Sequence, residues 1–348
     1  LGLDFAFLSN RLQFSGDIYQ RKTTDMFTVG MSLPAVFGTD VPKGNYADLT
    51  TKGFELSVSW RDQFQLASKP FNYEVDKYNN PEKKLGDDYY YEGMKVGEIW
   101  GYETEGFFTS QADIDSHAKQ PYFYAGATAG QWLPGDIKFK DLNGDGVIDY
   151  GNNTVDNPGD QKIIGNSEPR FIYGINLSGD WNNFFVSAFF QGVGKQDWWP
   201  GSEASYFWGM YNRPYNDMPK SHLGNIWTEE NPNTYFPRLR GYSSEEPYAE
   251  LNLKQTRYLQ NIAYIRMKNI QLGYTLPKSF ISKLRMQNAK VYVSGENLWS
   301  WSPFYKYSKD LDVEAVRGSD RDLTEGTSGN GYSYPILKSV SFGLSVTF

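Results

Sequence analysis

Apolar and polar residues alternate strictly at the end of this chain. Between Ser339 and Phe348 every even position is apolar and every odd position is small or polar. A period of two predicts a β-strand with one apolar and one polar face. The pattern runs directly into an aromatic last residue. This is typical of an outer-membrane barrel, whose strands face lipid on one side and water on the other.

The same alternation recurs along the chain and predicts about nine strands. Alternating or strand-like stretches cover residues 12–18, 54–60, 171–177, 183–191, 264–276 and 289–293, and the stretch at 264–276 is expected to contain a bulge. Residues 71–75 form a shorter stretch, below the ~9–11 residues that a spanning strand needs. That shortness raises the question of whether residues are missing between Val75 and Asp76. One helical turn is expected, at residues 279–284.

The lengths of the connectors predict an orientation. Short connectors are expected at residues 9–10, 180–182 and 277–285, and long ones at 23–48, 76–168, 192–256 and 300–336. Outer-membrane barrels have short periplasmic turns and long extracellular loops. If Phe348 lies on the periplasmic side, every long connector falls outside. Residues 76–168 and 193–256 are therefore predicted to be long extracellular loop regions.

The strand count and the composition place the chain in a larger transmembrane protein that is not an enzyme. A closed antiparallel barrel whose ends join needs an even number of strands, so nine strands predict the last part of a bigger barrel. The chain has no cysteine, two histidines far apart in sequence (His117 and His222) and a net charge of −7, which disfavours thiol chemistry, imidazole clusters and a nucleic-acid surface. Adjacent carboxylates such as Glu245 and Glu246 point to opposite faces of a strand and cannot flank one glycosidic bond. The chain opens within a strand-like segment, so it is expected to belong to a longer mature protein.

Several segments resemble the C-terminal part of the SusC/RagA family, the TonB-dependent outer-membrane transporters of Bacteroidetes. They are NRLQFSGDIYQRKTTDMF, LPAVFGTDVPKGNYADLTTKGFELSVSWRD, YYEGMKVGEIWGYETEGFF, PGDIKFKDLNGDGVID, IIGNSEPRFIYGINLSGDW, GSEASYFWGMYNRPYN and VSFGLSVTF. The resemblance implies a 22-stranded barrel with an N-terminal plug and a TonB-contacting segment, neither of which lies in this chain. The strand after Pro70 is shortened relative to that pattern.

One loop has the spacing of a calcium site. Oxygen-bearing side chains stand at Asp141, Asn143 and Asp145, with glycine at the sixth position, as at the start of an EF-hand loop. Val147 would add its backbone carbonyl and Asp149 would ligate through water. The twelfth position is Asn152 and not the usual glutamate, so Asp156 or Asp160 is the candidate for the last ligand. We expect Ca²⁺, or Mg²⁺, to stiffen this loop; the alternative is a polar turn that binds nothing.

A second loop gathers aromatic side chains. They are Trp198, Trp199, Tyr206, Trp208 and Tyr211, with Phe207 among them. Flat aromatic faces can stack on sugar rings, so these residues are candidates for contact with a substrate or with a lid protein. The alternative is that they pack inside the loop.

Two further patterns predict structural roles. Trp60, Trp181, Trp299 and Trp301 stand near expected strand ends, where aromatic girdles meet the membrane interface. Ser341, Gly343, Val346 and Phe348 follow an order that resembles the signal read by the barrel-assembly machinery. The alternative for these residues is an ordinary last strand.

The resemblance implies import of a nutrient across the outer membrane. The expected cargo is an oligosaccharide, with a SusD-like surface lipoprotein acting as a lid and with energy from TonB–ExbB–ExbD through a part outside this chain. The alternatives are a RagA-type peptide importer, a passive porin-type barrel, and a secreted glycan-binding β-protein.

Overall fold

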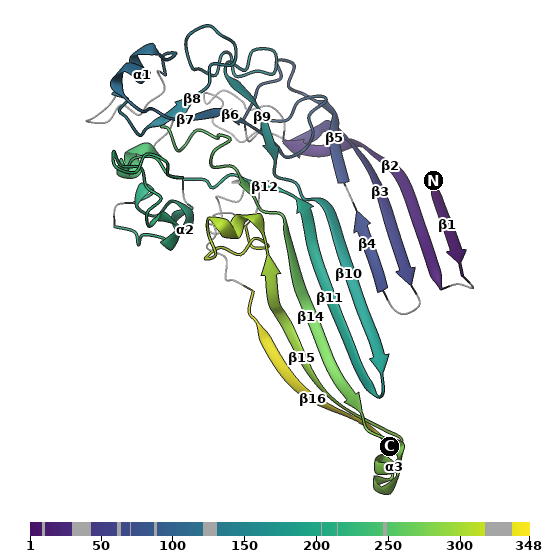
Figure 1. Cartoon of the computed structure of the whole chain (residues 1–348). Coiled ribbons are helices and arrows are strands. Elements are labelled where there is room, and N and C mark those ends of the chain that lie inside the picture. The colour runs from purple at the N-terminus through teal and green to yellow at the C-terminus, as the bar shows by residue number, and fades with distance from the viewer. Residues whose placement is uncertain are drawn as a thin grey trace.

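A computed structural model describes residues 1–8, 11–29, 43–60, 64–69, 71–86, 89–120, 131–202, 204–213, 215–245, 249–316 and 336–348. Long antiparallel strands form one curved sheet, and the long connectors gather at one end of it (Figure 1). Its strands are β1 (Gly2–Phe7), β2 (Leu12–Val29), β3 (Lys43–Trp60), β4 (Phe64–Lys69), β5 (Phe71–Tyr78), β10 (Arg170–Trp181), β11 (Phe184–Lys195), β14 (Tyr264–Thr275), β15 (Asn288–Trp301) and β16 (Ser339–Thr347).

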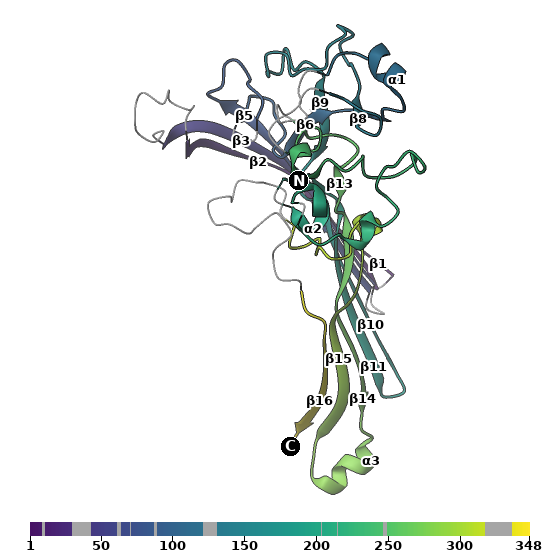
Figure 2. The ribbon, with the colours of Figure 1, turned by 90° about the vertical axis from the view of Figure 1, so that its left-hand side faces the viewer.

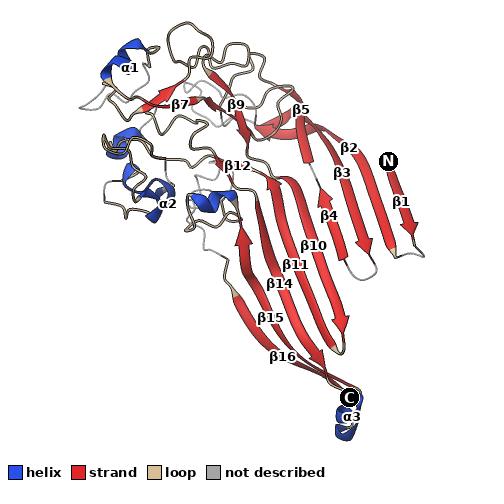
Figure 3. Cartoon of the chain, viewed as in Figure 1, coloured by secondary structure: helices blue, strands red, loops and turns tan. Residues whose placement is uncertain are grey.

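Shorter elements lie in the connectors and at one turn. The strands are β6 (Glu98–Tyr102), β7 (Thr104–Phe107), β8 (Ile137–Phe139), β9 (Gln161–Asn166), β12 (Asp197–Trp198) and β13 (Gln260–Asn261). The helices are α1 (Gln111–Ser116), α2 (Ser205–Trp208), α3 (Lys278–Ile281) and the 3₁₀ turns η2 (Gly209–Tyr211), η3 (Lys220–His222), η4 (Gly241–Ser244), η5 (Ser282–Leu284) and η6 (Pro303–Lys306). Most helices lie at the loop end of the sheet, whereas α3 lies at the other end (Figure 3). The described residues contain no helix long and apolar enough to cross a membrane.

The described strands occupy nine positions in the sheet, as the alternation predicts. Their order is β1-β2-β3-β4-β10-β11-β14-β15-β16, with every neighbouring pair antiparallel. The bulge expected in β14 is present, because its register with β15 shifts between Met267 and Asn269. The helical turn expected at 279–284 is present as α3 followed by η5.

The prediction of a short strand at 71–75 is wrong, because these residues belong to a longer strand that is interrupted. β4 and β5 lie end to end along β3. Leu56 of β3 pairs with Ser68 of β4, and Gly53 of β3 pairs with Phe71 of β5. The alternation is hidden because Pro70 stands between the two halves, and proline cannot donate a hydrogen bond to a ladder. Together the two halves are long enough to span, so no missing residues are needed between Val75 and Asp76.

The strands β2 and β3 also extend further than the sequence predicts. The expected connector at 23–48 is shorter by half, because β2 reaches Val29 and β3 begins at Lys43. The ladder continues past a bulge near Asp25, whose N–H donates to Asp48 Oδ1 at 2.9 Å. Polar residues dominate this extension, so a search for alternating apolar positions misses it. Figure 2 shows β2, β3 and β5 curving away from the rest of the sheet.

The two faces of the sheet differ along matched rows of residues. One row on the apolar face joins Phe342, Val293, Leu272 and Val186 across four neighbouring strands, and all four are exposed, Phe342 by 83%. The next row along the strands, on the opposite face, joins Gly343, Tyr292, Gly273 and Phe185. Aromatic rings and glycines alternate in this second row. The alternation in sequence has thus become two chemically distinct surfaces.

The connectors divide between the two ends of the sheet as predicted. The β10–β11 turn is a two-residue hairpin, Asn182-Asn183, with φ of 48° and 70°. Positive φ at both central residues is the geometry of the turn that suits twisted strands. The expected connector at 9–10 lies outside the described residues. The turn with α3 is at the same end, whereas the long connectors lie at the other (Figure 1).

Candidate functional site

The long connectors fold into a body with its own core, which we call the loop body (the described residues of 79–168, 196–262 and 302–316). Its fully buried side chains include Trp198, Trp208, Tyr258, Phe236 and Phe304. Their rings meet mainly edge to face; the centroids of Phe207 and Trp208 are 4.8 Å apart at 87°. Edge-to-face pairs stabilise beyond the area that they bury. The loop body is therefore a packed structure and not a set of separate loops.

Four of the five aromatic residues proposed to contact a substrate or lid lie inside this core. Trp198, Trp208 and Tyr211 are at most 1% exposed, and Trp199 is 8% exposed. The indole N–H of Trp208 donates to the carbonyls of Pro200 and Gly201, and the Tyr211 hydroxyl donates to Pro237 O at 2.6 Å. In this structure these four side chains pack inside the loop body, and their contact with a substrate or lid stays a prediction. Tyr206, by contrast, is half exposed.

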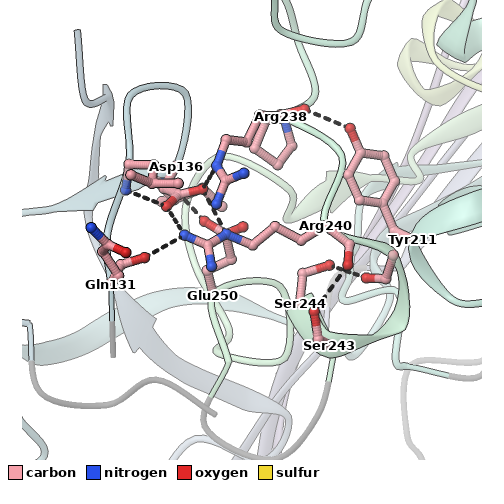
Figure 4. Close-up of polar contacts among 12 residues, drawn as sticks. Gln131, Asp136, Tyr211, Arg238, Arg240, Ser243, Ser244 and Glu250 are labelled. Carbon is pink, nitrogen blue, oxygen red and sulfur yellow. Dashed lines mark hydrogen bonds and ion pairs between the residues drawn. The ribbon is translucent and has the colours of Figure 1, made fainter. Parts of the chain in front are cut away.

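A buried charge cluster joins the two longest connectors (Figure 4). Asp136, from the first, is fully buried and accepts hydrogen bonds from Arg238 Nε at 2.5 Å and Arg240 Nε at 2.9 Å, both from the second. Breaking a buried pair by removing one partner is strongly destabilising, because the other charge stays buried. The sequence reading missed this cluster. Its one signal was the spacing of Arg238 and Arg240, which puts both side chains on one face of an extended segment.

Glu250 lies beside this cluster and is also fully buried. Its Oε2 accepts the Ile137 N–H at 2.8 Å, whereas its Oε1 has no hydrogen-bond partner. Burial, together with the negative charge of Asp136, raises the pKa of Glu250 to about 8. The fold therefore favours the protonated form of this side chain more than water does.

The proposed cation loop is a turn whose carboxylates bind its own backbone. Asp141 accepts the N–H groups of Gly144 at 2.6 Å and Gly146 at 2.9 Å, and the second contact lowers the pKa of Asp141. Asn143 Oδ1 accepts the Asp145 N–H, and Asp145 Oδ1 accepts the Val147 N–H, each at 2.9 Å. These bonds fix the loop by themselves.

Asp160 closes the base of this loop. It is fully buried, and its two oxygens accept the N–H groups of Leu142 at 2.7 Å and Asp149 at 2.9 Å. Burial raises the pKa of Asp160. The Asp149 side chain turns to the Gly151 N–H at 2.7 Å. Asp160 thus holds the backbone at the base of the loop, and its expected role as the last ligand stays a prediction.

The residues fit a cation in part. Asp141, Asn143 and Asp145 stand in one turn, and oxygen atoms are the ligands that Ca²⁺ and Mg²⁺ prefer. Yet within the described residues no three His, Asp or Glu side chains converge as a metal site would require. Calcium at this loop therefore stays a prediction.

The expected assembly residues lie on the last strand of the sheet. Gly343, on β16, is opposite Tyr292, and a Cβ at position 343 would lie 2.1 Å from Tyr292 Cζ. A larger residue at position 343 would therefore have to displace the Tyr292 ring. Val346 pairs with Ala289, and Phe348, just after β16, is 76% exposed. Their role as an assembly signal stays a prediction.

Comparison with known proteins finds receptors that resemble the chain over its whole length. No family model matches it. The chain is 29% identical over 369 residues to the TonB-dependent receptor P3 of Formosa agariphila and 23% identical to the TonB-dependent receptor SusC of Bacteroides thetaiotaomicron, covering 33% and 31% of those proteins. A solved structure of the RagAB peptide transporter superposes on all of the chain with a TM-score of 0.69 at 20% identity, over 34% of that transporter chain.

These relatives confirm the resemblance and the fold. They are named as receptors and transporters, not as enzymes, and the chain spans about a third of their length. The alternating faces of the sheet agree with a wall of such a barrel in the outer membrane. The chain is therefore a homologue, over its whole length, of TonB-dependent receptors that include SusC, and it has the fold of part of their outer-membrane barrel.

Proposed function

We propose that this chain is the C-terminal part of an importer that takes up oligosaccharides through the outer membrane with energy from TonB–ExbB–ExbD. The observation that carries the proposal is the likeness of the entire chain to TonB-dependent receptors, SusC among them. The exposed apolar face of the sheet supports contact with lipid, and the barrel-assembly machinery would insert it. A SusD-like lipoprotein would cover the loop body from outside.

Peptide import is the second candidate. The solved structures that match the chain are named for a peptide transporter, although at 20% identity this likeness shows the fold alone. Neither cargo uses the chain as a catalyst; the loop body would position the cargo above the barrel. The long connectors would then lie on the extracellular side, as their lengths predict.

Uptake by the full-length receptor tests the proposal. Cells that carry the receptor and its lipoprotein should accumulate labelled oligosaccharides, and cells without the receptor should not. Loss of TonB should abolish uptake, whereas a passive porin would keep it. Uptake of labelled peptides in place of oligosaccharides would replace the first candidate by the second.

We also propose that the loop at 141–149 binds Ca²⁺, or Mg²⁺, through Asp141, Asn143, Asp145, the Val147 carbonyl and Asp149. The spacing of these oxygens supports the proposal, and Asp160 would complete the loop from its base. The role of the ion would be to stiffen an exposed loop.

A further inference from the structure

A short helical turn lies at the end of the sheet opposite the loop body (Figure 1). It contains α3 and η5 and joins β14 to β15, and we call residues 276–287 the turn cap. Its helix ends at Arg285, whose φ is 57°, and the Met286 N–H donates to Ile281 O at 3.1 Å. A residue in the left-handed region ends a helix in this way, so the chain returns sharply to the sheet.

The turn cap is tied to the two last strands. The Leu276 N–H donates to Ala289 O of β15 at 2.8 Å, and the Gln287 N–H donates to Thr347 O of β16 at 2.7 Å. Helix α3 contacts β15, and Ile281 of the helix and Ala289 of the strand are only 3% and 1% exposed. The turn cap is therefore a fixed part of the fold.

The turn cap lies at the end of the apolar face of the sheet. Ala289 is four residues from Val293 on β15, so the two side chains share a face. Val293 belongs to the exposed apolar row that contains Phe342. One further row lies between this row and Ala289, and it joins Trp181, Phe184, Tyr274, Val291 and Leu344.

This intermediate row is rich in exposed aromatic side chains. Trp181 is 77% exposed and Phe184 is 49% exposed, and Tyr274 stands beside Phe184. Aromatic residues form a girdle where the lipid-facing surface of a barrel meets the headgroups. The turn cap follows this girdle by one row, which places it at the level of the headgroups.

The charged side chains of the turn cap are all positive. Lys278, Lys283 and Arg285 are exposed, and Phe280 beside them is 55% exposed. In the described part of the chain none of these three cations forms an ion pair. The sequence has no Asp or Glu from 251 to 295, although the whole chain has a net charge of −7. The turn cap is thus a concentrated positive patch on an acidic chain.

The neighbouring strands do not neutralise this patch. Strands β14 and β16 contain no Asp or Glu. The one carboxylate in β10 and β11 is Asp180, which pairs with Phe185 on the opposite face of the sheet. The positive charge therefore calls for an anionic partner from outside the chain.

We propose that the turn cap binds the headgroups of anionic phospholipids in the inner leaflet of the outer membrane. The inference rests on the proposed function for the placement of this end on the periplasmic side. The headgroup phosphates carry the complementary charge, and the exposed ring of Phe280 offers apolar surface to the adjoining acyl chains. Exposed cations next to an aromatic ring are typical of helices that lie in the plane of a membrane interface.

Continuity with the apolar face favours a bilayer over a soluble acidic protein as the partner. The turn cap covers Ala289 on that face and follows the aromatic row directly. Long cationic side chains at such a level extend their charge to the headgroups and leave their stems along apolar surface. One Lys or Arg near an anionic membrane surface strengthens binding by about fivefold.

Fluorescence quenching in the full-length receptor tests the inference. A fluorophore is attached at Ser282→Cys, an exposed position between the cations, with any cysteine elsewhere replaced. The bilayers contain equal amounts of phosphatidylglycerol and phosphatidylcholine, and one lipid at a time carries bromine near the glycerol end of its chains. Brominated phosphatidylglycerol should quench as if it were enriched about fivefold beside the turn cap, the value of one cation.

Removal of the charges should remove this preference. Lys278→Gln, Lys283→Gln and Arg285→Gln together should make the two lipids quench equally, and high salt should do the same in the unmodified receptor. The matched control removes three exposed cations of the loop body, Lys119, Lys220 and Lys309, and should keep the preference. Both triple variants should give the same yield of heat-resistant barrel, because all six side chains are exposed.

The outcomes separate this inference from the proposed function. Equal quenching by the two lipids in the unmodified receptor, or a preference that survives the three substitutions in the turn cap, would overturn the inference. Quenching by neither lipid would also overturn it, because the turn cap would then stand clear of the bilayer and be open to a soluble acidic partner. Uptake of labelled oligosaccharides tests the proposed function separately, since lipid selection at the turn cap requires insertion of the receptor but not import.

Discussion

The sheet and the loop body bury their apolar residues in opposite ways. In the sheet, Phe342, Leu344 and Leu272 are more than half exposed, and they form rows along one face. In the loop body, Trp208, Tyr258 and Phe304 are at most 1% exposed. The apolar face of the sheet is stable only in contact with an apolar solvent such as lipid. The loop body instead buries its apolar side chains in its own core, as a water-soluble domain does. One chain thus carries two kinds of stability, and each can be perturbed alone.

The largest difference between the effects on the loop body and on the sheet is expected from Trp208→Ala. The side chain is fully buried and its N–H is bonded, so its loss should destabilise the loop body by about 3–5 kcal/mol. Hydrogen exchange in the full-length receptor should rise across 196–262 and stay unchanged in β10, β11, β14, β15 and β16. Tyr206→Ala, in the same helix and half exposed, is the control. Equal exchange in the two variants would show that α2 does not anchor the core.

A pH titration should affect the loop body alone. Folded Glu250 keeps its proton up to about pH 8, whereas the unfolded chain loses it near pH 4.5. The stabilisation is therefore complete below pH 4.5 and falls by about 1.4 kcal/mol per unit until about pH 8. Denaturation of the loop body, followed by tryptophan fluorescence at pH 5.5, 6.5 and 7.5, should show this slope. Glu250→Gln should remove this dependence of the free energy of unfolding on pH. If the dependence persists in the variant, another titratable group causes it.

Gly343→Ala is expected to have a smaller effect, which falls on the sheet and not on the loop body. The new Cβ would collide with Tyr292 and destabilise the sheet by about 1–3 kcal/mol, with no effect on the loop body. The yield of heat-resistant folded barrel measures it. Adding Tyr292→Ala should restore that yield if packing is the cause. Failure of the double variant to recover would instead support the role of Gly343 in an assembly signal.

The smallest effect is expected at the cation loop. If Asp141 and Asp145 ligate Ca²⁺, millimolar calcium should slow hydrogen exchange across 141–151, and Asp141→Ala with Asp145→Ala should remove that response. Exchange elsewhere should not change, because the backbone bonds of Asp160 hold the base of the loop. Identical exchange with calcium and with chelator in the unmodified receptor would leave the loop as an ordinary turn.

The sequence predicted the sheet better than the loop body, for physical reasons. Strands in contact with lipid must alternate apolar and polar residues, so β16 and β10 can be predicted directly from the sequence. The strand β4 was not predicted, because Pro70 follows it and interrupts the pattern. Burial in the loop body depends on distant partners: Asp136 meets Arg238 across 102 residues, which no local pattern encodes. Aromatic residues such as Trp198 look alike in a sequence whether they face a ligand or a core. The spacing at Asp141 is shared by ion loops and by turns that bind their own backbone.

The central claim is that the alternation of β16 separates a lipid-facing from a water-facing surface. This chain has no cysteine, so single cysteines can carry nitroxide labels in the full-length receptor, with any cysteine elsewhere replaced. In bilayers, labels at Phe342 and Leu344 should collide with oxygen and be protected from a water-soluble nickel complex, whereas labels at Ser341 and Ser345 should show the reverse. Equal accessibility at the two sets of positions would contradict the claim.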